Sequence, residues 1–569
     1  MASSILWPLL GVMFVVFLFL RKTDPRLKHI PIVRYSSYLP DIFNRLIFYP
    51  RASSMIYGGY EKYRNSPFRV LTGDGEIVVL PVKYLEELRH LPPAIISSLD
   101  AQYENALGDY TNIVISSYLP SMTVRKRLTP SLTRVTPWII DELRYAFDAA
   151  LPECDGNKAS YYQVFLVQSE TYTNITGLSK DRWVSVKPHE LFVQLIARAT
   201  SRVVAGEALR RNEEWLNTAS AYSINVGLTV LLLRPFPSFA RPFVAPFLPP
   251  VRQMKQQLQF VKDLFAPMII ERRKAEDNPK YVKPDDFLQW MMDMAEDEQD
   301  LDPEMLAHHM LLLMSLAVVH TSSMALCHAL YDLIARPEYL APLREEINRT
   351  LSSGWDHATK ASLDAQRRLD SFLRESQRFG PPGECAPSPF PFLLLLLLVL
   401  IREVSFHRIV KESLTLSDGI QLPRGTHICF PSGPISKDPA FITNPKVFDG
   451  FRWCPDPKDR HALVGADDAS STDTGSEKQH PTSLAPSTST SFVSISASNM
   501  HFGVGRQACP GRFFAANTIK AILSRIIMDY EFKFDDDFTG RRPANFLVGE
   551  HILPNTSTPV LFRKRSVEH

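Results

Sequence analysis

The chain has 569 residues, of which 45% are hydrophobic, and it carries 63 basic against 61 acidic side chains. This near balance of charge lacks the basic footprint of a nucleic-acid binder, so we expect no nucleic-acid partner. Six cysteines without a CxxC pair are too sparse for a disulfide scaffold and wrongly spaced for a zinc ribbon, which indicates a reducing compartment.

An uncharged apolar run opens the chain, from Ile5 to Leu20, and Arg21 and Lys22 follow it directly. Its 16 residues would span about 24 Å as a helix, slightly short of an average bilayer, but the endoplasmic-reticulum membrane is thin. A cleaved signal peptide would place basic residues before the run and small residues after it. We predict a retained transmembrane anchor at residues 1–22, with the body of the protein in the cytoplasm.

The stretch 23–50 is rich in Pro and aromatic residues, and we predict a membrane-proximal hinge there. One large domain is expected from 51 to 569. Alternating apolar residues in FRVLTGDGEIVVLPV, residues 68–82, predict a β-hairpin with Gly-Asp-Gly at the turn. Helical patterns dominate from about 100 to 380.

The clearest helix is expected to begin after Asp302, a candidate N-cap, with Pro303 at its first position, and to end at Ala335. It is apolar on nearly every face, which predicts that it passes through the middle of the protein. A shorter helix should end in FLRESQRFGPP, strands should flank a turn at 417–419, and a last helix should run from Pro510 to about Tyr530. The expected fold is mainly α with small β-sheets (α+β).

Two stretches depart from these patterns. Residues 383–404 hold six consecutive leucines, an apolar run too short to span a membrane, and we interpret them as a retained intron. The codons for Gly383, Glu384 and Cys385 can contain a splice-donor sequence. The alternative is a genuine insertion, which would be an aggregation hazard if exposed. Residues 466–499 are a low-complexity Ser/Thr segment and are predicted to be a disordered loop.

A lone cysteine lies in HFGVGRQACPGRFFA, residues 501–515, just before the last predicted helix. Gly503 and Gly505 permit backbone angles closed to other residues, and Gly511 would let a flat ligand or another backbone come close. The helix N-terminus and a bound metal would each stabilise the Cys509 thiolate. A buried structural cysteine remains open at this point, whereas a dinucleotide loop is disfavoured because its third glycine is misplaced.

The pattern Phe502-x-x-Gly505-x-x-x-Cys509-x-Gly511 resembles the haem-binding signature of cytochrome P450 enzymes, and the CPGRFFA continuation is similar to fungal members. The resemblance implies the cytochrome P450 fold, a single haem domain and haem b as cofactor. It also implies that Cys509 is the axial iron ligand, whose thiolate favours cleavage of the O–O bond.

Three further residues resemble the family's buried charge cluster. Glu375 and Arg378 form an E-x-x-R pair on one helix face, and FDGFRW supplies Arg452. The resemblance implies that this trio supports the cysteine loop, the alternative for the pair being a solvated surface interaction. Arg408, after His407, matches an arginine that contacts a haem propionate, the alternative being an ordinary basic residue on a strand.

In the long helix, Thr321 matches the hydroxyl that donates to bound dioxygen, and His320 replaces the family's usual acid. His320 could relay protons, since its unperturbed pKa is near 6.5; a satisfied core histidine is the alternative. We interpret His308, His309 and His328 as structural.

The sequence departs from the family near the expected haem propionates. Gln507 stands where Arg or His is usual, and no W-x-x-x-R motif is evident, so that Arg125 and Arg127 are the nearest basic candidates. Arg506 is a possible substitute for the missing basic residue, although a fixed loop would point it elsewhere. These departures predict either weaker haem binding or a larger contribution of Arg408 to haem binding.

The resemblance implies a haem-thiolate monooxygenase of the endoplasmic-reticulum membrane that oxidises a lipophilic small molecule. Electrons would come from NADPH through NADPH–cytochrome P450 reductase. The stretch VVHTSSMALCHALYDL is most similar to fungal enzymes of secondary metabolism, which often act on terpenoid or meroterpenoid skeletons. Three alternatives stay open: a haem-thiolate isomerase or dehydratase, an inactive haem-binding protein, and an anchored protein without haem.

Overall fold

The structure is a computed structural model that describes residues 23–73, 75–113, 117–151, 183–234, 236–379, 404–454, 490–535, 541–548 and 551–565. The predicted anchor at 1–22 lies outside the described residues. So do all but the last residue of the predicted insert at 383–404 and the part of the low-complexity loop from 466 to 489.

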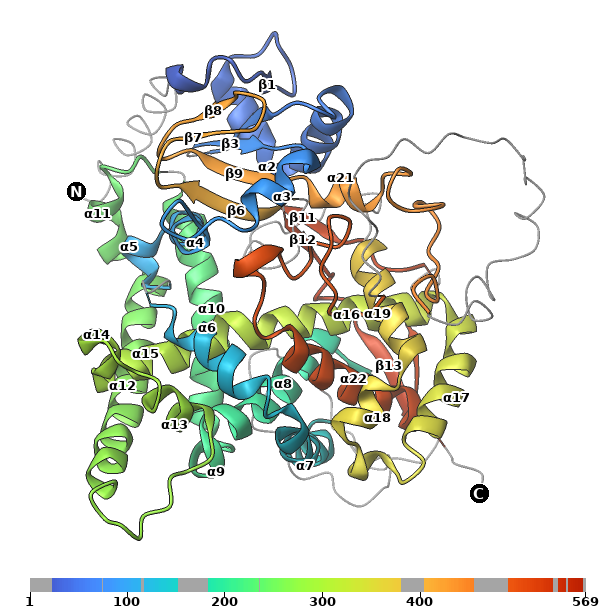
Figure 1. Ribbon diagram of the computed structural model, residues 1–569. Helices are drawn as coiled ribbons and strands as arrows, with labels where there is room; N and C mark the ends of the chain where they lie inside the picture. The colour runs from blue at the N-terminus through green and yellow to red at the C-terminus, as the bar shows by residue number, and fades with distance from the viewer. Residues whose placement is uncertain are drawn as a thin grey trace, which may run out of the picture.

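Most of the molecule is helical, with the main sheet at one end and smaller sheets elsewhere, so the predicted α+β class is confirmed (Figure 1). The longer helices of the body, apart from the central one, are α7 (Leu132–Ala150), α8 (Pro188–Val204), α10 (Glu213–Leu233), α12 (Pro249–Ala275), α17 (Leu340–Thr350), α19 (Arg367–Phe379) and α22 (Arg512–Asp529).

The main sheet has six strands in the order β1-β2-β3-β9-β6-β4. The strands are β1 (Ile32–Val33), β2 (Phe68–Leu71), β3 (Glu76–Val79), β4 (Ile96–Ser97), β6 (Ser405–Val410) and β9 (His427–Phe430). The predicted hairpin is confirmed, because β2 and β3 pair antiparallel with Phe68 opposite Val79. The two short strands β7 (Leu414–Thr415) and β8 (Gln421–Leu422) pair around the predicted turn at 417–419.

The C-terminal part of the chain forms two smaller sheets. The strands β10 (Tyr530–Phe534), β13 (Val560–Lys564) and β5 (Val184–Val186) form one of them, in that order. A hairpin of β11 (Phe546–Val548) and β12 (His551–Leu553) forms the other.

The segment 23–50 is part of the domain, and the prediction of a separate hinge there is wrong. Strand β1 pairs in parallel with β2, and helix α2 (Asp41–Lys62) continues across the predicted boundary at residue 50. Leu27 and Ile30 are buried, and the Arg69 guanidinium donates to the carbonyl of Ile30. The composition of this stretch concealed these long-range contacts.

The prediction of disorder up to residue 499 is also wrong for the described end of that loop. Phe492 is fully buried, and its backbone N–H donates to the Asp370 carboxylate at 2.6 Å. The Ser494 hydroxyl accepts a hydrogen bond from Arg374. One aromatic anchor and its backbone bonds therefore order a segment whose composition alone resembles a linker.

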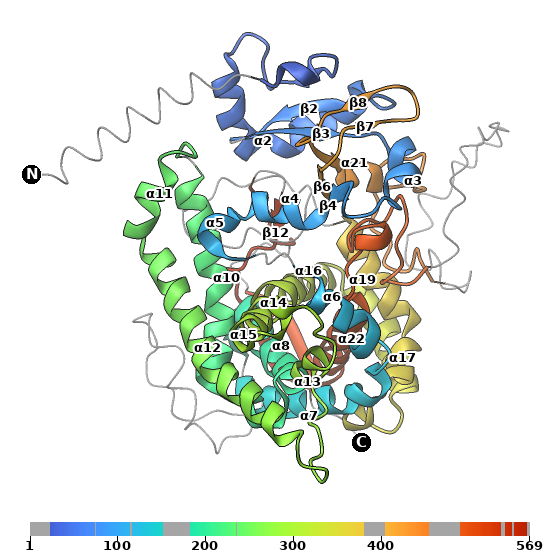
Figure 2. The ribbon, with the colours of Figure 1, turned by 60° about the vertical axis from the view of Figure 1, so that its left-hand side comes forward.

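The long central helix confirms its predicted start and end but contains an unpredicted π-helical segment. It consists of α15 (Pro303–Leu312), η5 (Leu313–Val319, π-helical) and α16 (His320–Ala335). The Asp302 side chain caps the first turn by accepting from the N–H of Glu304. Figure 2 looks nearly along this helix and shows α8, α10, α12 and α22 arranged around it.

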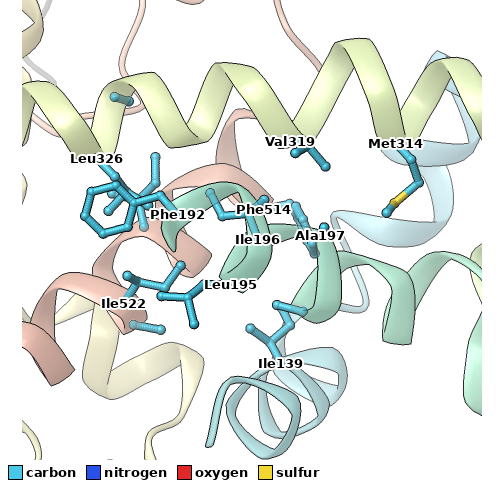
Figure 3. Packing of buried hydrophobic residues seen from close by; sticks show 14 of the residues in the cluster. Ile139, Phe192, Leu195, Ile196, Ala197, Met314, Val319, Leu326, Phe514 and Ile522 are labelled. Atoms are coloured by element: carbon cyan, nitrogen blue, oxygen red, sulfur yellow. The ribbon is translucent and has the colours of Figure 1, made fainter. Parts of the chain in front are cut away.

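Apolar packing fixes the position of this helix, as predicted. Figure 3 shows Phe192 of α8, Ile522 of α22 and Ile139 of α7 beneath it, with Leu326 of α16 pointing toward them. Among the described helices, the central one and α10 are long and apolar enough to cross a membrane, but more than half of each is buried inside the protein. Both are core helices of this domain.

Candidate haem site

A cavity of about 1290 Å³ lies between the central helix, the cysteine loop and the main sheet. The central helix contributes one continuous stripe to its wall: His309, Leu312, Leu313, Leu316, Ala317, Val318, Thr321, Ser322 and Ala325. The cysteine loop supplies residues 501–503 and 506–511, and Arg125, Phe406 and Arg408 also line the cavity. Most of this wall is apolar, which suits a lipophilic ligand.

The cysteine loop is folded tightly enough to fix the sulfur. The Cys509 N–H donates to the Phe502 carbonyl at 2.7 Å. Gly505 has φ +75°, and a Cβ on it would lie 2.2 Å from the Arg89 carbonyl oxygen, so a side chain is excluded by both strain and contact. Phe502 packs edge-on against Phe492, which ties the loop to the ordered end of the preceding segment.

The Cys509 side chain is exposed because it faces the cavity. The protein around the cavity nevertheless shields the thiol from bulk water. Burial raises the pKa of Cys509, whereas the backbone N–H groups of Gly511 and Arg512 and the charge of Arg512 lower it. Burial is the larger effect. A thiol in this place therefore ionises poorly alone and is well suited to a metal that stabilises the thiolate.

Two observations show that the residues present fit a haem. A Cβ on Gly511 would meet nothing within 4 Å, so space is open beside the sulfur. Arg408 is 5% exposed, and its Nε atom has no hydrogen-bond partner. Within the described chain, no carboxylate lies within ion-pair distance of Arg408. The Arg408 guanidinium donates from Nη1 to the His407 carbonyl at 2.8 Å. A buried guanidinium with no carboxylate partner is costly, and the carboxylate of a propionate would supply one.

The contacts of Gln507 show what this residue does at the position where the family usually has Arg or His. The Gln507 side chain accepts from the N–H of Ser98 at 2.9 Å and donates to the carbonyl of Ile96 at 3.2 Å. It therefore fastens the loop to β4 and to α4 (Ser98–Asn105). Arg125 lines the cavity and donates to the Arg506 carbonyl at 2.6 Å, whereas Arg127 is exposed and lies outside the cavity wall. Of the two predicted candidates, Arg125 is the one placed to reach a haem.

Glu375, Arg378 and Arg452 come together as predicted. Glu375 is fully buried and accepts from Arg378 at 2.6 and 2.8 Å and from Arg452 at 3.2 Å. Its two oxygens also accept from the N–H of Asp449 and from the Trp453 indole. Both guanidiniums donate further to backbone carbonyls, so that both arginines are themselves held in place.

Thr321 lies on the cavity wall, where its hydroxyl donates to the Ala317 carbonyl at 2.8 Å. The oxygen lone pairs remain available on the cavity side. His320 points away from the cavity, and this contradicts the predicted proton relay. Its Nε2 lies 2.9 Å from the carbonyl of Ser220 in α10, and its ring stacks against His189 of α8.

The π-helical segment causes this difference. Seven residues make two turns of an α-helix, which would place residue 320 on the same face as Leu313. A π turn takes up one more residue than an α turn, so Thr321 occupies that face instead. His320 is buried, which lowers its pKa, and burial lowers the pKa of His189 to about 3. Both rings are therefore neutral at physiological pH, as core histidines are.

The fold and the site together are those of a protein that can hold a haem beside a cysteine. The family model described as "Cytochrome P450" matches residues 186–387 and 400–551, more than half of the chain. The twelve residues between the two matched stretches lie within the predicted insert.

Known fungal proteins are similar over the whole chain. Cytochrome P450 monooxygenase penP of Penicillium crustosum is 41% identical over 99% of this chain and 96% of its own length. Cytochrome P450 monooxygenase paxP of Penicillium paxilli is 40% identical over 100% and 96%. AtmP of Aspergillus flavus, a further cytochrome P450 monooxygenase, is 42% identical over 94% and 89%. The chain belongs to the cytochrome P450 family, among its fungal monooxygenases, as its sequence predicted.

Replacing Arg408 with methionine is expected to have opposite effects on the two forms of the protein. The chain without haem should become more stable, because an unpaired buried charge is removed. Haem should bind about ten- to a hundredfold more weakly, because a charge-assisted hydrogen bond to it is lost. Thermal unfolding of the haem-free chain and haem transfer to a haem-free acceptor protein measure the two effects.

The matched control for Arg408 is Arg424→Met. Arg424 is exposed in the turn between β8 and β9 and lies outside the cavity wall. This substitution should change neither the stability of the haem-free chain nor the affinity for haem. Equal haem affinity in the wild type and Arg408→Met would show that Arg408 does not hold the cofactor.

Proposed function

We propose that the protein is a membrane-bound haem-thiolate monooxygenase that oxidises an elongated lipophilic molecule, a terpenoid or meroterpenoid intermediate of fungal secondary metabolism. The observation that carries the proposal is the Cys509 thiol, which opens into a large, mostly apolar cavity also lined by Arg408, a buried arginine whose Nε has no hydrogen-bond partner. When bound, haem b supplies the activation of dioxygen, using electrons from NADPH delivered by NADPH–cytochrome P450 reductase.

The chain's own residues hold the cofactor and shape the site. Cys509 would supply the Sγ ligand, and Arg408 and Arg125 would pair with the propionates. The stripe of leucines on the central helix orients an apolar substrate and keeps water away. Thr321 holds one proton at Oγ1, which it donates to the Ala317 carbonyl, and the lone pairs of Oγ1 can accept a hydrogen bond at the cavity surface.

The membrane location is supported by exposed apolar side chains on two segments of the described chain. Tyr38 and Leu39 precede α2 and Phe43 lies in its first turn, whereas Phe243 and Phe247 lie in or next to α11 (Arg241–Val244). Both views place α2 and α11 in the upper part of the molecule (Figures 1 and 2). Together with an anchor at 1–22, these side chains suit the interface of the endoplasmic-reticulum membrane, with the domain on its cytoplasmic side.

A carbon monoxide difference spectrum tests the proposal. We would express the whole chain and a form lacking residues 383–404, reduce both and record the Soret band. The red-shifted band of a thiolate-ligated haem is expected in the deletion form. Its presence in both forms would show that the insert is tolerated, and its absence from both would overturn the haem-thiolate assignment. Reductase-dependent incorporation of labelled dioxygen then separates a monooxygenase from an isomerase or dehydratase.

Replacing Thr321 with alanine is expected to uncouple the reaction. Without the Oγ1 hydrogen bond at the cavity surface, proton delivery loses its positioned group, and we expect product per NADPH to fall about tenfold while peroxide release rises. The assay compares NADPH consumption, peroxide and product, using a terpenoid that shifts the haem spectrum.

Ser323→Ala is the matched control for Thr321. Ser323 lies on the same helix, and its hydroxyl also donates to a helix carbonyl, but it lies outside the cavity wall. Coupling should stay unchanged in this variant. The same loss in both variants would point to a general helix defect.

A further inference from the structure

A polar cluster interrupts the apolar cavity wall well away from Thr321. His309 of α15 and Ser117 both line the cavity, and both contact the buried carboxylate of Asp300 in α14 (Glu298–Leu301). The His309 Nε2 lies 3.4 Å from Asp300 Oδ1, and the Ser117 hydroxyl donates to Asp300 Oδ2 at 3.0 Å. His309 is only 2% exposed.

The contact with Asp300 favours one tautomer of the His309 ring. An ionised carboxylate accepts hydrogen bonds only, so Nε2 carries the hydrogen that points to Asp300. Burial lowers the pKa of His309 although Asp300 raises it, so the ring is neutral. Nδ1 is then an acceptor, and the part of the chain that the structure describes offers it no donor.

The position of His309 sets the length of a ligand that could reach it. His309 and Thr321 lie on one stripe of the cavity wall and are twelve residues apart. That separation corresponds to about 18 Å of helix, a little less where the segment is π-helical. Leu312, Leu313 and Leu316 cover the wall between them. A bound molecule that lies along this helix therefore meets an apolar stretch with the His309 acceptor at its far end.

We propose that His309, positioned by Asp300, is a specificity-determining residue that accepts a hydrogen bond from a hydroxyl or N–H group at the distal end of an elongated lipophilic substrate. The inference rests on the proposed function, because the reacting end of such a substrate faces Thr321 and Cys509. Anchoring the distal group fixes which carbon atom lies at the reacting end. A molecule without a donor there lies less firmly and is oxidised less selectively.

Alkylimidazoles test this without knowledge of the natural substrate. Their imidazole end binds the haem iron and so fixes one end of the molecule. Alkyl chains of roughly eight to sixteen carbons then reach a series of distances that includes the separation of about 18 Å between Thr321 and His309. We would compare chains ending in hydroxyl, methoxy or methyl groups by titrating the haem absorbance of the holoenzyme. The hydroxyl chain is expected to bind about tenfold more tightly than the methyl chain at one length only.

Variants assign that preference to His309. His309→Phe should abolish the advantage of the hydroxyl, and His309→Asn, which keeps an acceptor near the Nδ1 position, should retain part of it. Asp300→Asn allows the other tautomer of the ring, so the methoxy chain should gain on the hydroxyl chain. His308→Phe is the matched control, because His308 is a buried neighbour on the same helix that lies outside the cavity wall.

The proposal is overturned if no chain length favours the hydroxyl, if the preference survives His309→Phe, or if the chains fail to bind an enzyme that shows the thiolate-type carbon monoxide band. Absence of that band would instead reject the proposed function itself, so the two failures are distinguishable.

Discussion

Replacing Cys509 with serine is expected to remove the red-shifted carbon monoxide band and to lower turnover by at least about 1,000-fold, a loss of about 4 kcal/mol of transition-state stabilisation. A serine hydroxyl does not ionise near neutral pH and cannot supply the electron density of a thiolate. The fold should tolerate the change, because the Cys509 side chain faces an open cavity. Carbon monoxide difference spectra and NADPH-dependent product formation measure the effect.

Cys454→Ala is the control for this change. Cys454 is fully buried and lies outside the cavity wall, so its removal should cost some stability and leave the band in place. An intact band in the Cys509 variant would mean that another residue ligates the iron and that the site assignment is wrong.

Replacing Glu375 with glutamine is expected to destabilise the fold by about 3–5 kcal/mol, because two buried guanidiniums lose their carboxylate while the side-chain shape is kept. Domains of ordinary stability have about 5–15 kcal/mol in total, so this loss is a large fraction of the stability and should lower the yield of folded protein. The midpoint of thermal unfolding and the yield of haem-loaded protein measure the loss.

An exposed ion pair provides the comparison for Glu375. Glu345 is 73% exposed and pairs with Arg368 at 2.7 Å, so Glu345→Gln should change stability by less than about 0.5 kcal/mol. Similar losses of stability in the two variants would show that the buried trio of Glu375, Arg378 and Arg452 stabilises the fold no more than an exposed ion pair does. A stable Glu375 variant that binds no haem would instead place Glu375 in cofactor binding.

A substantial part of the site was predictable because its residues lie in short motifs. The glycines and the helix after Cys509 could be interpreted from local spacing, and the loop does use them in this way, with Gly505 packed against Arg89 and Gly511 open beside the sulfur. The meeting of Glu375, Arg378 and Arg452 followed from a family pattern, not from any physical signal in the sequence. Local spacing alone gave no reason for Arg452 to return to α19.

The sequence by itself determined the class of fold, the ends of the central helix and the residue that faces the haem site, because capping residues, apolar periodicity and the cysteine loop are local features. The tertiary structure decided which histidine faces the cavity. The π-helical segment moves the lining face from His320 to Thr321, and nothing in the residue types of 313–319 indicates the extra residue. It also decided that His309 meets Asp300 and Ser117, since these lie on separate elements that only folding brings together.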